Sequence, residues 1–240
     1  MLAANEEIAG LMAEAFAPQI TLQAGMTRAF KAFIFDFDGV VVDTEKYHYL
    51  SWVASAAHVG YDLGWEEYLP LKSTGNTEIT QYICDHSGKE VSEELFQIMR
   101  NTKLTSFDEL VKDLSEKDVL PGIRDFLTWL NGQNVRTAVA SSSNTSSGLA
   151  KRFGLDKHFQ AIIDGNMKLP RKPAPDTFLL AAKMLGVDPA DCIVFEDSLA
   201  GIGAAVNAGM PVVAVGGIRS EHAIAHIDDF QDIRKFFEGR

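Results

Sequence analysis

Two acidic residues, Asp36 and Asp38, stand one residue apart at the end of an apolar run that begins at Phe30. The run is typical of a strand buried in the middle of a parallel sheet. Two carboxylates at its carboxyl end are costly unless they are paired, bind a metal or are neutralised. Gly39 follows and permits a sharp turn, because glycine adopts positive φ without steric cost. Ligands bind at this edge of an open α/β sheet, so the pattern predicts a site that compensates the two acids.

Polar side chains also follow later apolar runs of the chain. They are Ser141, Ser142, Lys172, Glu196 and Asp197. The serines follow one predicted strand, the acid pair follows another, and Lys172 stands between them in a proline-stiffened loop. We expect these side chains to meet, because the carboxyl ends of parallel strands share one edge of the sheet. Carboxylates from two strands suit a hard cation such as Mg²⁺, and the cation, the lysine and the hydroxyls together suit a phosphate dianion.

Strands and helices alternate through most of the chain, which predicts an α/β fold with a doubly wound, Rossmann-like parallel sheet. The predicted strands cover 30–35, 135–140, 161–163, 192–195 and 212–215. The predicted helices cover 122–133, 145–154, 176–186, 198–209 and 229–238. Residues 43–117 differ, because helical patterns follow one another there without a strong strand. We therefore expect a helical domain at 43–117, inserted between two parts of a catalytic core, 29–42 and 118–240.

Residues 1–28 form an acidic N-terminal extension whose apolar positions have helical spacing. The extension lacks the basic start and the long apolar centre of a secretory signal. We expect it to be a loosely docked or poorly ordered amphipathic segment.

Composition narrows the classes of function. The chain of 240 residues has a formal net charge of −11, which argues against a general nucleic-acid binder. It has no apolar run of about 18 residues, so we expect no membrane span. Cys84 and Cys192 lie far apart, which indicates neither a zinc site nor a disulfide framework. A reducing, cytoplasmic setting is the expectation.

Four motifs in this order resemble the haloacid dehalogenase-like superfamily, in the branch of the β-phosphoglucomutases and small sugar phosphatases. They are D-F-D-G-V-V-V-D-T from Asp36, the serine at 141, K-P-A-P-D from Lys172, and F-E-D-S-L-A-G-I-G-A-A from Phe195. The likeness covers residues 30 to 217 and preserves the order and spacing of the motifs.

The resemblance implies a role for each matching position. Asp36 would be the nucleophile that forms an aspartyl-phosphate, and Asp38 would be the general acid and base. The phosphoryl group would be bound by Ser141, Ser142 and Lys172. The implied cofactor is Mg²⁺, and its ligands would be Asp36, Asp38 (through its backbone carbonyl), Glu196 and Asp197.

The resemblance also identifies residues 43–117 as a cap domain, which closes over the site and selects the substrate. Four candidate substrate contacts lie in it: His48, Trp52, Lys72 and Asn76. His48 could equally be a satisfied helical histidine, and Trp52 has the simpler explanation of a cap core residue. The mutase branch carries an arginine shortly after the cap lysine, where residues 74–77 offer none, and a lysine where this chain has Asn144.

Without those two cations a bisphosphate intermediate has less support. The sequence therefore favours a Mg²⁺-dependent phosphatase that acts on a small phosphorylated metabolite, a sugar phosphate, with a β-phosphoglucomutase as the alternative. A phosphate-binding regulator without catalysis is the third hypothesis, and the presence of Asp36, Asp38 and Asp197 disfavours it. We expect a monomer whose partner is the metabolite, with no nucleic acid and no membrane.

Overall fold

The computed structural model describes residues 19–21, 27–72, 74–231, 233 and 237. The chain divides into two compact units, a core of residues 1–42 and 119–240 and a cap of residues 43–118. The predicted border lies one residue earlier. Asp118 closes the cap, because its carboxylate accepts from the backbone N–H of Ser115 at 2.6 Å and its carbonyl accepts from that of Asp43 at 2.7 Å.

Most of the predicted extension at 1–28 and of the predicted helix at 229–238 lies outside the described residues. Within 1–28, two short strands are described, β1 (Gln19–Thr21) and β2 (Thr27–Ala29), which pair antiparallel.

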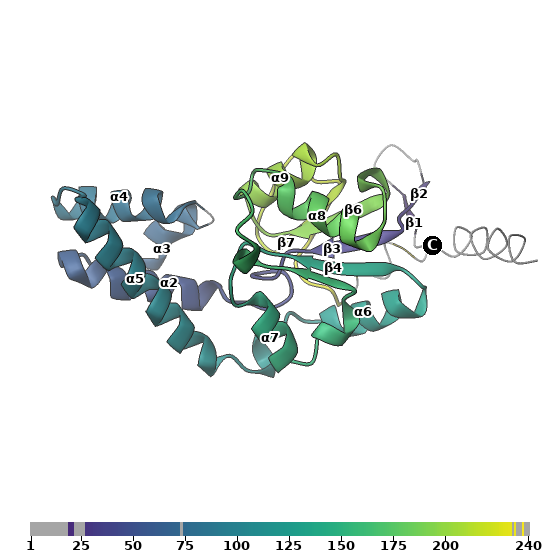
Figure 1. The fold of residues 1–240 in the computed structure, drawn as a ribbon, viewed down its shortest axis with the longest axis horizontal. Helices are drawn as coiled ribbons and strands as arrows, with labels where there is room; N and C mark the ends of the chain where they lie inside the picture. Colours follow the sequence, from purple (N-terminus) through teal and green to yellow (C-terminus); the bar gives the residue numbers. More distant parts are fainter. Residues whose placement is uncertain (1–18, 22–26, 73, 232, 234–236, 238–240) are drawn as a thin grey trace, which may run out of the picture. The chain divides into compact units, whose positions relative to one another are not determined.

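Within the described residues, six parallel strands form the central sheet of the core, in the order β5-β4-β3-β6-β7-β8 (Figure 1). Their bounds are β3 Ala32–Phe35, β4 Arg136–Ala140, β5 Ala161–Ile163, β6 Cys192–Glu196, β7 Val212–Val215 and β8 Ala225–Ile227. The predicted α/β fold with a parallel sheet is confirmed. β8 was not predicted, because a three-residue A-H-I segment carries too little apolar pattern to signal a strand.

The register places the candidate residues at one level of the sheet edge. Phe35, the last residue of β3, pairs with Val139 of β4 on one side and with Phe195 of β6 on the other. The backbone N–H of Asp36 continues this pattern and donates to the carbonyl of Phe195 at 2.9 Å. Three adjacent strands therefore end together, and the residues that follow them are neighbours in space.

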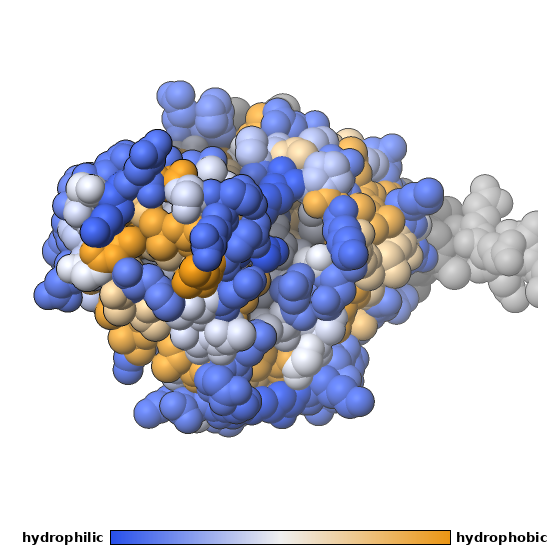
Figure 2. Space-filling view, turned by 60° about the vertical axis from the view of Figure 1, so that its left-hand side comes forward, coloured by the Kyte–Doolittle hydropathy of each residue, from blue (hydrophilic) through white to orange (hydrophobic). Residues whose placement is uncertain are grey.

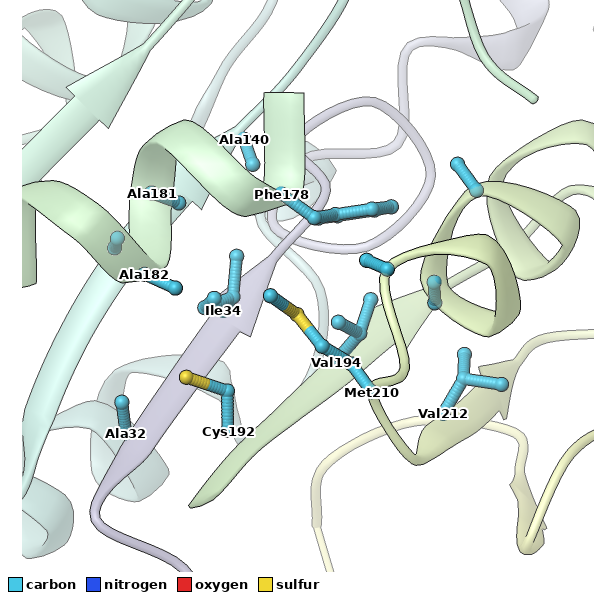
Figure 3. Packing of buried hydrophobic residues seen from close by; sticks show 14 of the residues in the cluster. Ala32, Ile34, Ala140, Phe178, Ala181, Ala182, Cys192, Val194, Met210 and Val212 are labelled. Carbon is cyan, nitrogen blue, oxygen red and sulfur yellow. The ribbon is translucent and has the colours of Figure 1, made fainter. Parts of the chain in front are cut away.

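Helices cover the sheet on both faces (Figure 1). α8 (Asp176–Leu185) and α9 (Leu199–Asn207) pack on one face, and Figure 3 shows Phe178 and Ala182 of α8 above Ile34. Side chains alternate along a strand, so Phe33 and Phe35 point to the opposite face. Phe126 of α6 (Ile123–Gly132) meets Phe35 there with ring centroids 6.2 Å apart. Another core helix among the described residues is α7 (Ser146–Arg152).

The described part of the cap is helical. Its α-helices are α2 Glu45–Ala56, α3 Trp65–Tyr68, α4 Asn76–Ser87 and α5 Glu93–Leu110. Short 3₁₀ turns lie at Ala57–Val59, Leu69–Leu71, Val111–Asp113 and Glu116–Asp118. Ser92 caps α5 as its position in the sequence predicts, because its hydroxyl oxygen accepts from the backbone N–H of Leu95 at 3.1 Å. The cap has an apolar core of its own, in which Trp52, Ile83 and Met99 are buried.

The surface in Figure 2 is mostly hydrophilic, with hydrophobic residues in separate patches. Scattered apolar residues of this kind are ordinary for a folded surface. Of the helices in the described ranges, none has the length and apolar character needed to cross a membrane.

Candidate active site

Lys172 joins the ends of three strands. Its Nζ donates to Oδ1 of Asp36 at 2.5 Å, to Oε1 of Glu196 at 2.6 Å and to the carbonyl of Ala140 at 3.2 Å. Asp36 directly follows β3, Glu196 is the last residue of β6, and Ala140 is the last residue of β4. The ammonium also lies 4.6 Å from the ring centre of Phe178. The lysine side chain is only 7% exposed. A buried ammonium therefore links two carboxylates that stand on adjacent strands.

The charged groups of this cluster shift one another's pKa. Burial raises the pKa of Asp36 well above its usual value, Lys172 opposes the rise, and Glu196, Asp38 and Asp197 add to it. Burial alone would lower the pKa of Lys172, but Asp36 and Glu196 outweigh it and raise that pKa above its usual value. The ammonium thus stays charged between Asp36 and Glu196, while Asp38 and Asp197 lie close enough to raise the pKa of Asp36.

Ser141 faces the second acid of the D-x-D motif. Its hydroxyl donates to Oδ2 of Asp38 at 3.4 Å, and its oxygen accepts from the N–H of Ser143 at 3.0 Å and from the hydroxyl of Ser146 at 2.8 Å. The side chain of Ser141 is buried by these contacts, whereas Ser142 is exposed in the same loop. The loop after β4 therefore fixes the Ser141 hydroxyl beside Asp38.

Asp197 packs against the turn that follows Asp38. Gly39 has a φ of +78°, and a Cβ atom there would lie 2.3 Å from Oδ2 of Asp197. Any side chain at position 39 would force the carboxylate away, so glycine serves both the turn and the close approach. The two loops after β3 and β6 thereby bring Asp38 and Asp197 together.

Glu196 has partners for both carboxylate oxygens. Oε1 accepts from Lys172, and Oε2 accepts from the N–H and the hydroxyl of Ser198, both at 2.9 Å. Ser198 in turn caps α9 by accepting from the N–H of Gly201 at 3.0 Å. A Cβ atom at Gly201 would lie 1.7 Å from Oε1 of Glu196, so the carboxylate packs directly on the helix backbone. The assignment of Glu196 to the metal stays a prediction; in the structure its carboxylate contacts Lys172 and Ser198.

The remaining oxygens suit a magnesium ion. The described residues contain no ready group of three or more His, Cys, Asp or Glu side chains arranged to hold a metal. Mg²⁺ does not need one, since it is held by one or two carboxylates together with waters and phosphate oxygens. The carboxylates of Asp36 and Asp197 and the backbone carbonyl of Asp38 are hard donors of that kind. Glu196, Asp38 and Asp197 raise the pKa of Asp36 by repulsion, and a divalent cation bound there would relieve that repulsion.

The cap contains a cationic group of its own, formed by His48, Lys72 and Lys103. Nζ of Lys103 lies 3.2 Å from Nδ1 of His48, and the imidazole stacks on Phe107 with ring centroids 4.1 Å apart. Burial lowers the pKa of His48 well below its usual value, and Lys103 and Lys72 lower it further. The imidazole is therefore neutral and leaves the two lysines as the charges of the group.

Sequence reasoning missed Lys103. It lies on α5 between Met99 and Phe107, each four residues away and buried, and its own side chain is buried with them. A lysine on the apolar stripe of a helix is the signal that would have identified it, since lysine is rarely buried without a partner. Lys72, which the sequence did select, lies 3.1 Å from Oε2 of Glu45.

Two other cap predictions have different outcomes in the structure. Trp52 is 2% exposed and belongs to the apolar core of the cap, so its side chain offers almost no surface to a substrate. Asn76 is the first residue of α4 and is partly buried.

Comparisons with known proteins agree with this arrangement. Residues 30–209 match the family model of the haloacid dehalogenase-like hydrolases. The chain is 37% identical to β-phosphoglucomutase of Bacillus subtilis (strain 168) over 190 residues, which cover 78% of this chain and 83% of the relative. It is 30% identical to the fructose-1-phosphate phosphatase YqaB of Escherichia coli (strain K12) over 190 residues, 79% of this chain and 98% of the relative.

Among solved structures, the fold is similar to that of β-phosphoglucomutase from Clostridium difficile. The TM-score is 0.75 at 32% identity, and the match covers 85% of this chain and 93% of the other. The likeness therefore extends over both the core and most of the cap.

Proposed function

The chain belongs to the haloacid dehalogenase-like hydrolases, and on that premise we propose that it is a Mg²⁺-dependent phosphatase that hydrolyses a small sugar phosphate through an aspartyl-phosphate. The observation that carries the proposal is the Lys172 ammonium, buried between Asp36 and Glu196 at 2.5 and 2.6 Å. A cation held at this point, beside a carboxylate and a serine hydroxyl, suits a phosphoryl group in transfer.

Asp36 and Asp38 divide the chemistry between them. The carboxylate of Asp36 attacks phosphorus and displaces the sugar oxygen, which takes a proton from Asp38 as it leaves. A water molecule then attacks the aspartyl-phosphate, and Asp38 accepts its proton. Ser141 holds Asp38 in place through the bond at 3.4 Å and offers its hydroxyl to the phosphoryl oxygens.

Mg²⁺ is part of the proposal. Asp36, Asp197 and the backbone carbonyl of Asp38 would hold it, and when bound it would neutralise charge on the phosphoryl oxygens. Glu196 acts through Lys172 in this account, because both of its oxygens already have partners in the protein.

The choice of phosphatase over mutase rests on neutral residues. Both kinds of enzyme occur among the relatives, a β-phosphoglucomutase and a fructose-1-phosphate phosphatase. A mutase must retain a bisphosphate, which calls for additional cations. This chain has no arginine at 74–77 and has Asn144 where the mutase branch carries a lysine. The mutase remains the second candidate, since the cap supplies Lys72 and Lys103.

The cellular compartment, the oligomeric state and the partner belong to the same proposal. We assign the enzyme to the cytoplasm as a monomer, with the sugar phosphate as its partner. Cys84 and Cys192 are buried free thiols, which suits a reducing compartment.

The test is turnover of fructose 1-phosphate and of β-glucose 1-phosphate, each with Mg²⁺ and with excess EDTA. Free phosphate and glucose 6-phosphate are both scored, in the presence and absence of a glucose bisphosphate primer. We expect free phosphate that depends on Mg²⁺. Glucose 6-phosphate as the main product would replace the phosphatase by the mutase, and no product from either sugar would contradict both.

A further inference from the structure

Two buried serine hydroxyls meet where the chain leaves β4. Ser146 is the first residue of α7 and is fully buried, and its hydroxyl donates to Oγ of Ser141 at 2.8 Å. Ser141 directly follows β4 and is 2% exposed. Both serines belong to the core, so this contact lies within one compact unit of the chain. The mechanism described above uses the hydroxyl of Ser141 and gives no role to that of Ser146.

The oxygen of Ser141 has both of its acceptor positions filled. A serine hydroxyl has one proton to donate and two lone pairs that accept. The Ser141 oxygen accepts from the backbone N–H of Ser143 at 3.0 Å and from the hydroxyl of Ser146 at 2.8 Å. Its one proton is therefore directed at an acceptor outside this loop, and in the structure that acceptor is Oδ2 of Asp38 at 3.4 Å.

The hydrogen bond from Ser141 to Asp38 is long. Its 3.4 Å exceeds the roughly 2.7–2.8 Å that is most common for an O–H···O bond. The proton can therefore turn to a closer acceptor, and charged oxygens such as those of a phosphoryl group form the stronger bonds. Ser141 is thus a hydroxyl whose lone pairs are fixed by the protein and whose proton is available to a ligand.

Ser146 has one competing acceptor. The carbonyl oxygen of Ser143 lies 3.3 Å from Oγ of Ser146, compared with 2.8 Å for Oγ of Ser141. If Ser146 donated to that carbonyl, Ser141 could donate to Ser146 and its proton would point away from Asp38. The shorter distance favours donation from Ser146 to Ser141. The direction of this one buried bond therefore decides where the proton of Ser141 points.

We propose that Ser146 is a positioning residue that acts through Ser141, because the hydrogen bond it donates directs the Ser141 proton toward the phosphoryl oxygens of the substrate. The inference rests on the proposed function, since it takes Ser141 as a contact of the phosphoryl group. Successive hydrogen bonds polarise one another, so Ser146 also makes Ser141 a stronger donor. The ligand concerned is a phosphate ester or inorganic phosphate, because both present the same oxygens.

The neighbouring Ser147 provides a matched control. Its hydroxyl donates to Oδ2 of Asp164, whose Oδ1 accepts from the backbone N–H of Asn166 at 3.0 Å. Asp164 is 7% exposed, so this bond is also shielded from water, and it joins α7 to the segment after β5. Ser146→Ala and Ser147→Ala therefore each remove one hydroxyl from the first turn of α7, but only the first removes a partner of Ser141.

The test is a double-mutant cycle on the full chain with Ser141→Ala, Ser146→Ala and the double variant. The measurements are calorimetric affinity for inorganic phosphate in the presence of Mg²⁺ and kcat/KM for fructose 1-phosphate. We expect Ser146→Ala to lower both about fivefold, the scale of one hydrogen bond. In a chain that already carries Ser141→Ala, the same substitution should have no further effect. Ser147→Ala should change both by less than about twofold.

A merely structural Ser146 would give a different pattern. If its hydroxyl only bonds the carbonyl of Ser143, Ser146→Ala lowers phosphate affinity by the same factor with and without the hydroxyl of Ser141. An additive cycle of this kind, no effect of Ser146→Ala, or an equal loss in Ser147→Ala overturns the role of Ser146. Circular dichroism checks the fold, and Ser146→Cys, which has a weaker donor, repeats the cycle if the alanine variant does not fold.

The outcomes distinguish the inference from the proposed function. A cycle that is non-additive in phosphate affinity, without release of phosphate from fructose 1-phosphate, contradicts the phosphatase and supports the positioning role. Turnover with an additive cycle overturns the role of Ser146 alone. A chain that neither binds inorganic phosphate nor releases it from the sugar overturns both.

Discussion

The core and the cap hold their candidate functional side chains in opposite ways. In the core, Asp36 and Glu196 are buried carboxylates that share one ammonium, and the acids outnumber the cation. In the cap, Lys103 lies on α5 and Lys72 directly follows the turn at Leu69–Leu71, and the carboxylate of Glu45 pairs with Lys72. The side chains of Lys172 and Asp36 are enclosed, whereas those of Lys72 and Glu45 are partly open to solvent.

This difference bears on what each group can do. A buried charge that loses its partner is strongly destabilised, so the core cluster tolerates little change and suits chemistry that needs fixed geometry. A partly exposed ion pair is worth less, so its charge can be tuned at small cost. We therefore expect large effects from substitutions in the core and graded effects from substitutions in the cap.

Asp36→Asn is the strongest test of the core. The amide cannot form an aspartyl-phosphate, so we expect phosphatase turnover to fall about 10⁴-fold or more. Phosphate release from fructose 1-phosphate is the measurement, with circular dichroism and thermal melting to verify that the variant is folded. Turnover within tenfold of the unsubstituted chain would mean that Asp36 is not the nucleophile.

Lys172→Met tests how much the buried ammonium group of Lys172 contributes to the stability of the fold. The substitution leaves Asp36 and Glu196 buried without their cation, which should cost about 3–5 kcal/mol of unfolding free energy. Urea denaturation measures the loss. Arg171→Met is the matched control. Arg171 is the cation next to Lys172 in the sequence and is exposed, so its substitution should cost less than about 0.5 kcal/mol of unfolding free energy. Equal losses in the two variants would show that the buried ammonium has no special role.

The arrangement of the core site could be predicted because sheet topology does most of the positioning. An apolar run that ends in Asp36 predicts a buried strand, and parallel strands bring their ends to one edge whatever their separation along the chain. The sequence could not assign the separate roles of Glu196 and Asp197. They are adjacent, and only the packing of Glu196 on Gly201 and Ser198 shows which of them turns toward Lys172.

The cap site was less predictable, because contacts between helices depend on which faces pack. Lys103 and His48 are 55 residues apart, and no spacing rule connects them. Glu45 stands in the first turn of α2, where acids are favoured in any case, so its position alone gives no sign of a functional role. Its pairing with Lys72 depends on a tertiary contact between α2 and the turn at Leu69–Leu71.

The neutral imidazole of the cap predicts a sensitivity to acid. Burial, Lys103 and Lys72 hold the pKa of His48 well below its ordinary value of 6.5. As the pH falls below 6.5, the unfolded chain takes up a proton at His48 and the folded cap does not, so stability falls with pH. Above 6.5 the ring is neutral in both states and the effect vanishes. Each tenfold difference in proton affinity corresponds to about 1.4 kcal/mol.

His48→Gln should remove this part of the acid dependence. Melting temperatures at pH 7.5 and pH 5.5 give the measurement, and we expect a smaller drop in the variant than in the unsubstituted chain. His58→Gln is the control, because His58 is exposed and its Nε2 lies 2.7 Å from the hydroxyl of Thr102 in α5. Identical drops in His48→Gln and the unsubstituted chain would contradict the neutral buried ring.

The smallest expected effect comes from comparing a buried threonine of the cap with a buried threonine of the core. Among the described residues, Thr80 of the cap has the one buried side-chain oxygen without a hydrogen-bond partner. Thr137 of the core is equally buried, but its hydroxyl donates to the carbonyl of His158 at 2.5 Å and lies 3.2 Å from Oε1 of Gln160. Valine has nearly the shape of threonine, so a Thr→Val change at each position isolates the hydroxyl.

We expect Thr80→Val to raise the unfolding free energy by about 0.5–1 kcal/mol, because it removes a polar atom that is desolvated without compensation. Thr137→Val should lower it by about 1–2 kcal/mol, because the carbonyl of His158 loses its donor. Helix propensity does not decide the first case, since threonine and valine are similar in a helix. Urea denaturation of the two variants in parallel gives the measurement. A loss of stability in Thr80→Val would show that its hydroxyl has a partner, such as an ordered water, and that the cap satisfies its buried polar groups as fully as the core does.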